Sequence, residues 1–213
     1  MPSPILCAKG LSFGPTRNMP LVRNLSFDLY PSQLLWVSGP NGAGKSTLIR
    51  VILNQGWIES GILEKQIEGK NIGYLPQLQN RQFHLPVTLK DIVVMAVGKP
   101  LSSDQIIQLG LLRPEQLHLG WNTASGGERK RALLTRLLLQ NPTLLILDEP
   151  FGHLDAESYT LVVQVIERFL TTPSGQQREK SALIVEHGAI PETLGRFDVV
   201  KMEIGYGTAV VSR

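Results

Sequence analysis

The sequence reads Gly39-Pro40-Asn41-Gly42-Ala43-Gly44-Lys45-Ser46 at the point that decides its fold. This stretch satisfies the pattern G-x-x-x-x-G-K-[ST] of a phosphate-binding loop. Before it, the apolar run Gln33–Ser38 is typical of a strand covered on both faces, and residues 45–53 after it have good helix composition. A strand, a glycine-rich turn and a helix in this order form a cradle for phosphate, because backbone N–H groups and the helix N-terminus face the anion.

The rest of the chain predicts an α/β fold with a parallel sheet. Short buried strands are expected at residues 144–147 and 182–185, on either side of an amphipathic helix at 156–170. Strand, helix and strand in this order imply a parallel connection. The other expected elements are strands at 25–29, 62–67 and 72–75, helices from 89 to 97 and from 102 to 109, a helix-prone segment at 129–140, and a closing hairpin at 199–211. We expect one domain, residues 1–213, with a helical insert at about residues 80–140.

Composition and charge exclude several classes of protein. The 213 residues are 42% hydrophobic, and 21 Lys and Arg against 18 Asp and Glu give a net charge of +3, too small an excess to argue for nucleic acid. The single cysteine, Cys7, excludes an intrachain disulfide and a Cys-cluster metal site. No apolar run approaches the roughly 18 residues that span a bilayer, and no secretory signal pattern is present. We therefore expect a cytoplasmic protein.

A magnesium nucleotide site is the chemistry that the motifs predict. Lys45 would bridge the β- and γ-phosphates, and Ser46 would bind Mg²⁺. The buried run at 144–147 leads into Asp148, which would hold Mg²⁺, and Glu149, which would polarise the attacking water as general base. The alternative is that Asp148-Glu149-Pro150 is only a turn that ends a core strand. The phosphate-binding loop favours the first interpretation, because the two features together describe one site.

Residues 124–128 read Ala-Ser-Gly-Gly-Glu and precede the helix-prone segment at 129–140. They resemble the signature of ATP-binding cassette (ABC) ATPases, which is usually Leu-Ser-Gly-Gly-Gln, with Ala124 and Glu128 as departures. Taken alone, Ser125-Gly126-Gly127 would be an N-cap and no more. Within the resemblance, Ser125 and the glycine N–H groups form an anion site at the start of a helix.

Three further motifs resemble those of the ABC family, in the family's order. Gln77 looks like the Q-loop glutamine that reaches Mg²⁺, and Asp155 looks like the D-loop aspartate, although His153 departs from that motif. His187 resembles the switch histidine that contacts the γ-phosphate and orients Glu149. A surface histidine at the end of a strand is the alternative for that residue.

The resemblance implies an ABC-ATPase fold, in which a parallel core sheet is joined by an antiparallel β subdomain and a helical insert. It implies that ATP and Mg²⁺ are bound, with Lys45, Glu149 and His187 as catalytic residues. The implied magnesium ligands are Ser46, Gln77 and Asp148. The implied ATP-binding residues are Phe13, Gly39, Pro40, Asn41, Gly42, Ala43, Gly44, Lys45, Ser46, Thr47, Gln77, Ser125, Gly126, Gly127 and Asp155. Phe13 is the candidate that stacks on adenine, and a phenylalanine in a core strand is the alternative.

In this family the signature of one subunit closes over ATP held by the loop of another. The resemblance therefore implies a homodimer or a paired cassette that nucleotide closes. It also implies a membrane permease as partner, a location on the cytoplasmic face of the cell membrane, and a solute-binding protein in the full system.

Non-transport relatives that act on nucleic acid or ribosomes are the alternative. They usually carry coiled coils, zinc modules or two cassettes, whereas only the 47 residues 78–124 separate Gln77 from Ser125 here. The cations Arg129-Lys130-Arg131 are interpreted as a solvated helix face, so no nucleic acid is expected.

Residues 73–77 and 83–93 are similar to the ABC branch that imports zinc, manganese or iron. This segment would lie at the permease contact, so it indicates the partner first and the cargo only indirectly. Importers of metal chelates and exporter ATPases remain alternatives. No metal-ligand spacing is found among the histidines, which are His84, His118, His153 and His187, so we expect the cargo to be bound elsewhere.

Overall fold

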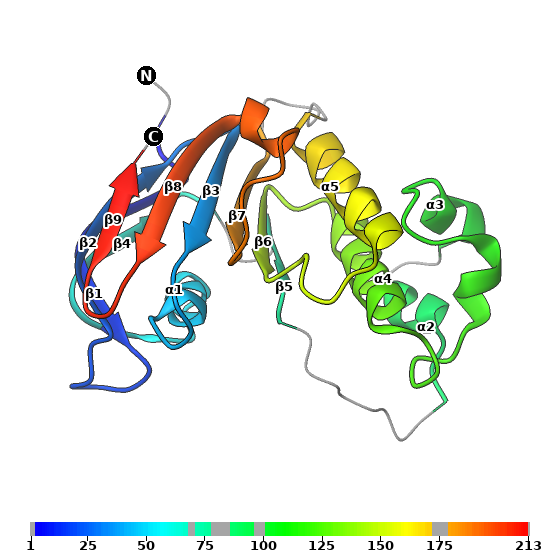
Figure 1. Ribbon diagram of the computed structural model, residues 1–213, viewed down its shortest axis with the longest axis horizontal. Helices are drawn as coiled ribbons and strands as arrows, with labels where there is room; N and C mark the ends of the chain where they lie inside the picture. Colours follow the sequence, from blue (N-terminus) through cyan, green and yellow to red (C-terminus); the bar gives the residue numbers. More distant parts are fainter. Residues whose placement is uncertain (1–2, 68–70, 78–85, 96–100, 172–178, 213) are drawn as a thin grey trace.

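The central sheet has six strands in the computed structural model (Figure 1), which describes residues 3–67, 71–77, 86–95, 101–171 and 179–212. Their order is β5-β6-β7-β3-β8-β9, and all neighbours are parallel except β8 and β9. The strands are β5 (Ile72–Leu75), β6 (Leu144–Asp148), β7 (Ser181–Val185), β3 (Gln33–Ser38), β8 (Asp198–Ile204) and β9 (Ala209–Ser212). The predicted parallel sheet and closing hairpin are therefore confirmed.

Strand β3 lies inside this sheet and is covered on both faces. Leu35 and Val37 pack in one core with helix α1 (Lys45–Ile52), whereas Leu34 and Trp36 pack in a second core with helix α5 (Ala156–Thr171). All four side chains are buried. A strand buried on both faces has a continuous apolar sequence, which is the pattern that predicted it.

A second sheet is antiparallel, with the order β2-β1-β4. It consists of β1 (Leu6–Gly14), β2 (Val22–Leu29) and β4 (Trp57–Lys65), and it shares the first core with α1. The sequence pattern did not predict β1, because its pairing shifts register between Ala8 and Leu11 and its alternation is interrupted there. It also placed the start of β4 at Ile62, whereas the strand begins at Trp57.

The predicted helical insert surrounds an apolar cluster of its own, at the right of Figure 1. Its described elements are α2 (Leu89–Val94), α3 (Ser103–Ile107), the 3₁₀ helix η2 (Pro114–His118) and α4 (Gly126–Leu139). The capping box at Thr88 is confirmed: its Oγ1 accepts the N–H of Asp91 at 3.1 Å, and the Asp91 carboxylate accepts the N–H of Thr88 at 2.8 Å. The expected end of this helix at Val97 and the segment 78–85 lie outside the described residues.

The run Arg129-Lys130-Arg131 is not a solvated face, so that interpretation was wrong. Lys130 is 6% exposed and Arg131 is 8% exposed. Arg129 donates to the backbone carbonyls of Trp121 and Asn122. The reason is that α4 packs against α2, β5 and α5 at once, so most of its surface is covered. The sequence of one helix shows where its charges lie, but not that three other elements pack against it.

Candidate functional site

The loop between β3 and α1 forms an anion-binding cradle. Gly39, Gly42 and Gly44 have φ angles of 139°, 78° and 112°, which favour glycine. A Cβ atom at Gly39 would also lie 2.0 Å from the carbonyl oxygen of Ile204, so no other residue fits there. Helix α1 starts without a side-chain cap and has no acidic residue in its first turn. Its first N–H groups are therefore left for an anion.

Lys45 is buried beneath this loop. Its Nζ donates to the carbonyl oxygens of Gly39 at 2.7 Å and Pro40 at 2.9 Å. Burial lowers the pKa of Lys45, and the nearby carboxylates of Glu149 and Asp148 oppose this shift. An ammonium held by two loop carbonyls can exchange them for phosphate oxygens without a change in the backbone.

Asp148 and Ser46 form the candidate metal site. Asp148 ends β6 and is 3% exposed. Burial raises the pKa of Asp148, and a hydrogen bond with Ser46 opposes this shift. The Oδ1 atom of Asp148 is buried and has no hydrogen-bond partner among the described atoms. A carboxylate oxygen of this kind beside a hydroxyl is a hard-oxygen donor pair, so these residues fit Mg²⁺.

Glu149 lies between the side chains of Gln77 and His187. Its Oε2 accepts the Nε2–H of Gln77 at 2.7 Å, and its Oε1 lies 3.2 Å from Nε2 of His187. The backbone of Glu149 has a φ of 52°, and its N–H donates to the carbonyl of Val185 at 2.9 Å. Gln77, Glu149 and His187 follow β5, β6 and β7, which are neighbours in the sheet. The structure therefore brings these three predicted residues together.

One cavity of about 480 Å³ joins the loop to these side chains. This volume lies within the usual range for small-molecule sites, about 300 to 1,000 Å³. The described residues that line it are Leu21, Asn41, Gly42, Gly44, Lys45, Ser46, Thr47, Gln77, Glu149 and His187. Leu21 is the one member that the sequence analysis did not predict. Ala43 and Asp148 are buried and are not among the residues that line it.

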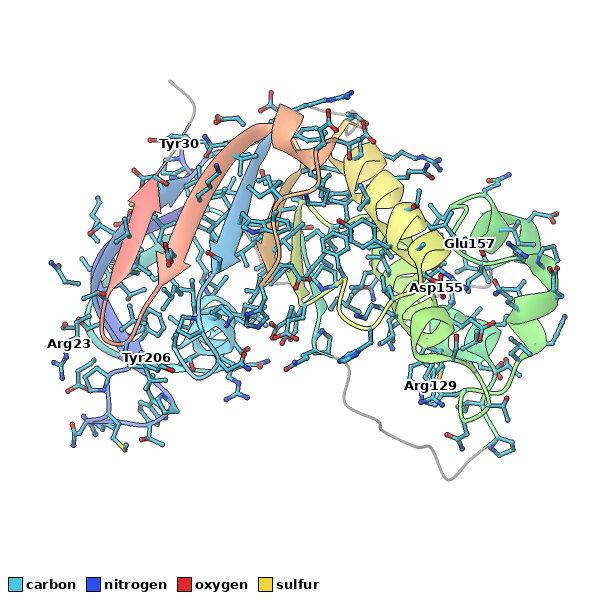
Figure 2. The ribbon with its side chains drawn as sticks, in the orientation of Figure 1. Arg23, Tyr30, Arg129, Asp155, Glu157 and Tyr206 are labelled. Atoms are coloured by element: carbon cyan, nitrogen blue, oxygen red, sulfur yellow. The ribbon has the colours of Figure 1, made fainter. Side chains whose placement is uncertain are left out.

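The other predicted nucleotide-binding residues lie elsewhere. Ser125 caps α4: its Oγ accepts the N–H of Glu128 at 3.2 Å, and Gly126 and Gly127 form the first turn. Asp155 caps α5 by accepting the N–H of Ser158 at 2.7 Å. Figure 2 shows Asp155 and Arg129 at the starts of these helices, far from Tyr206. Tyr206 marks the position of the phosphate-binding loop, because its hydroxyl donates to the Asn41 carbonyl at 3.4 Å. One chain therefore holds the two groups of motifs apart.

Phe13 does not lie in the site, so the prediction that it stacks on adenine was wrong. Its side chain is 0% exposed and belongs to the core between the antiparallel sheet and α1. On β1 it pairs with Val22 on one side and Ile58 on the other. The alternative, a phenylalanine in a core strand, is confirmed. The error follows from the missed strand, because only the pairing of β1 shows which face Phe13 occupies.

Sequence analysis also missed two buried charged residues beside the site. Lys130 donates through Nζ to the carbonyl oxygens of Glu149 at 3.0 Å and Gly152 at 2.8 Å. Glu186 accepts the N–H of Phe151 at 3.2 Å and that of His187 at 2.9 Å. Burial lowers the pKa of Lys130, and the carboxylates of Glu186 and Glu149 oppose this. Except for the bond between Glu186 and His187, these bonds join segments distant in sequence, so no local pattern signals them.

The described residues contain no membrane-spanning helix and no cluster of metal-binding side chains. None of their helices has both the length and the apolar character required to cross a membrane. Within the same part of the chain, His, Cys, Asp and Glu form no group of three or more that could hold a metal ion.

A family model described as "ABC transporter" matches residues 22–152. The chain is 33% identical over 167 residues to the zinc import ATP-binding protein ZnuC of Paracoccus denitrificans, covering 78% of this chain and 65% of that protein. It is 38% identical over 154 residues to ZnuC of Psychrobacter cryohalolentis, covering 69% of this chain and 61% of the relative. The chain thus spans less than two thirds of the length of these relatives.

Among the solved structures with a similar fold are two ABC proteins. A metal-chelate type ABC transporter in an inward-facing conformation superposes with a TM-score of 0.78 and 23% identity, covering 99% of this chain and 84% of that chain. A dimeric ATP-binding cassette bound to ADP and Pi superposes with a TM-score of 0.74 and 17% identity, covering 98% of each chain. These likenesses confirm the predicted ABC-ATPase fold.

The position of Phe13 gives a first prediction. Phe13→Leu removes buried apolar volume and should lower the free energy of unfolding by about 1 kcal/mol, measured by chemical denaturation. Nucleotide affinity, measured by calorimetry, should not change. Phe27→Leu is the matched control, because Phe27 is buried in the adjacent strand. A loss of nucleotide affinity of about tenfold in Phe13→Leu but not in Phe27→Leu would show that Phe13 does contribute to nucleotide binding.

Proposed function

The chain belongs to the ABC transporter family, and from this premise we propose that it hydrolyses ATP as the nucleotide-binding subunit of a membrane transporter. One observation carries the proposal. A single cavity joins the uncapped start of α1 to the Glu149 carboxylate, which lies between Gln77 and His187. The first part suits a triphosphate, and the second suits a water molecule that attacks it.

The loop holds the triphosphate by position and charge. Backbone N–H groups of residues 42–47 surround the phosphates, and Lys45 transfers its hydrogen bonds from the Gly39 and Pro40 carbonyls to phosphate oxygens. Ser46 and Asp148 would hold Mg²⁺, with Gln77 as a further ligand. The ion, when bound, neutralises charge on the β- and γ-phosphate oxygens. ATP affinity thus comes from residues that this chain supplies alone.

Glu149 accepts the proton of the attacking water. Its carboxylate is oriented from both sides, by the Gln77 amide and the His187 ring, and its backbone is fixed by the bond to Val185. General base catalysis of this kind contributes about 10²- to 10⁴-fold to the rate. His187 also lines the cavity, where it would contact the γ-phosphate and align the base with the bond that breaks.

Two chains complete each site, in a head-to-tail pair. Ser125 and Asp155 do not line the cavity of their own chain, so they serve the nucleotide of the partner. The Ser125 hydroxyl accepts the Glu128 N–H and keeps its own hydrogen to donate to a phosphate. The carboxylate of Glu128 accepts the N–H of Ser125 at 2.8 Å and the side-chain amide of Gln116 at 3.1 Å. This unusual signature residue therefore completes the cap of α4.

The transported cargo that we propose is zinc or a chemically similar divalent metal, taken up from outside the cell. The names of the relatives support zinc, and the resemblance of residues 73–77 and 83–93 to metal importers agrees with them. The chain would bind a membrane permease on the cytoplasmic face, and a solute-binding protein would deliver the metal. The cargo passes through the permease and does not contact the residues described here.

Replacing the base tests the chemistry. Glu149→Gln keeps the size of the side chain and an acceptor for the Gln77 amide but cannot take up the proton of water, so ATP binding should persist while turnover falls by at least about 10²-fold. The measurements are phosphate release and size-exclusion chromatography with ATP, which should show a trapped dimer. A variant that stays monomeric with ATP bound contradicts the paired site. Lys45→Ala is the control for binding and should lose nucleotide affinity itself.

Asp148→Asn tests the metal site. The substitution keeps the shape but removes the charge that attracts Mg²⁺, so the rise in melting temperature that Mg²⁺ adds to ATP should disappear, as should hydrolysis. ATP binding in the presence of a chelator should remain. Glu64→Gln, an exposed carboxylate change on β4, is the control and should behave as wild type. If Mg²⁺ still raises the melting temperature of Asp148→Asn with ATP as it does in the wild type, Asp148 does not bind the metal.

Co-purification tests the partner. The chain, expressed from its own genome with an affinity tag, should retain a multi-span membrane protein after detergent extraction, and cells that carry Glu149→Gln should lose uptake of radioactive zinc. Untagged cells and the wild-type chain are the controls. Hydrolysis that DNA or ribosomes stimulate, with no membrane protein retained, would instead support the non-transport class.

A further inference from the structure

Lys130 joins helix α4 to the turn that carries Glu149. Its side chain is 6% exposed, and its Nζ donates to the carbonyl oxygens of Glu149 at 3.0 Å and Gly152 at 2.8 Å. The Gly152 N–H also donates to the Glu149 carbonyl, at 3.4 Å. The ammonium therefore binds both ends of one turn. A buried ammonium needs such acceptors, so its position is closely determined by them.

This turn has a backbone that needs external support. Glu149 has a φ of 52° and His153 has a φ of 59°, in a region that residues other than glycine rarely adopt. Two of the supporting bonds come from β7 and the residue after it: the Val185 carbonyl accepts from Glu149, and the Glu186 carboxylate accepts from Phe151. The bonds from Lys130 come from α4. The turn is thus held between the sheet and α4.

The same helix presents a second functional group at its start. Ser125 is its N-cap, and Lys130 lies five residues later, which is about 7.5 Å along the axis. A helix over this length moves as one body. A displacement at the Ser125 end therefore also moves the ammonium, and with it the carbonyl of Glu149.

We propose that Lys130 is a positioning residue that couples the two nucleotide sites of a pair. It fixes the backbone of Glu149 relative to α4, so that a partner's nucleotide at Ser125 adjusts the carboxylate that acts on this chain's own nucleotide. This inference rests on the proposed ATP hydrolysis in a head-to-tail pair. Lys130 thereby gains a function that its neighbour Arg129 does not share, because none of the described hydrogen bonds of Arg129 is to the turn.

Lys130→Met is the test in the full chain, because Met has a similar length and no donor. ATP affinity and ATP-driven dimer formation should remain, since the loop and Ser125 are unchanged. The kcat for hydrolysis should fall about 10- to 100-fold, because small displacements of a catalytic group have effects of this size. Cooperativity in the dependence of rate on ATP should also be lost. Lys130→Gln keeps a donor and should have an intermediate rate.

Arg129→Met is the matched control, because it removes a cation from the same helix. Its guanidinium donates to the carbonyls of Trp121 and Asn122, and not to the turn. It should hydrolyse ATP at the wild-type rate and with the wild-type cooperativity. Thermal unfolding of all variants, with and without ATP, separates a folding defect from a positioning defect.

The double variant Glu149→Gln with Lys130→Met distinguishes an effect exerted through Glu149 from a general loss of structure. If Lys130 acts through the Glu149 carboxylate, the residual rate of Glu149→Gln should not fall further. An additive loss overturns the proposal, as does a wild-type rate in Lys130→Met or a loss of ATP affinity that parallels a loss of stability. A wild-type chain that does not hydrolyse ATP overturns the proposed function, and this inference with it.

Discussion

The pairing of β6 between β5 and β7 is the constraint on which the site depends. Leu75 pairs with Leu147, and Asp148 pairs with Val185, so the three strands end within one residue of each other in register, at the same edge of the sheet. The residues that follow them are therefore neighbours, although they are far apart in sequence. A shift of one residue in either pairing would turn the following side chains to the other face of the sheet. The buried apolar side chains on both faces oppose such a shift.

Four of the buried charged residues lie in or beside this site. Lys45, Lys130, Asp148 and Glu186 are each less than 10% exposed. Charges removed from water are costly unless they are paired or hydrogen-bonded. Here the two ammonium groups bind backbone carbonyls, and Glu186 binds two backbone N–H groups. Asp148 alone of the four retains an oxygen without such a partner among the described atoms, which makes it the member suited to a metal ion.

Local chemistry explains which parts of this molecule could be predicted from its sequence. The loop at 39–46, the capping box at Thr88 and strand β3 each depend on residues that are close in sequence, and each was predicted correctly. The errors at Phe13 and at Arg129-Lys130-Arg131 have the opposite origin. The burial of Phe13 depends on the pairing of β1 with β2 and β4, and that of Lys130 on three elements packed around α4. Such contacts form only in the folded chain.

Helices α1 and α4 begin with different caps, and this difference explains why they contribute unequally to nucleotide binding in the proposed site. Helix α1 has no side-chain cap, so its first N–H groups are satisfied best when phosphate is present. Helix α4 has a complete capping box, with the Ser125 N–H held by Glu128, so it is stable without a ligand. In the proposed site, affinity for the nucleotide would therefore reside in the loop before α1, whereas α4 would add only the Ser125 hydroxyl and the glycine N–H groups. In the head-to-tail pair that we propose, a contact this small is easily broken when the phosphate leaves, and pairing through α4 would for that reason be reversible.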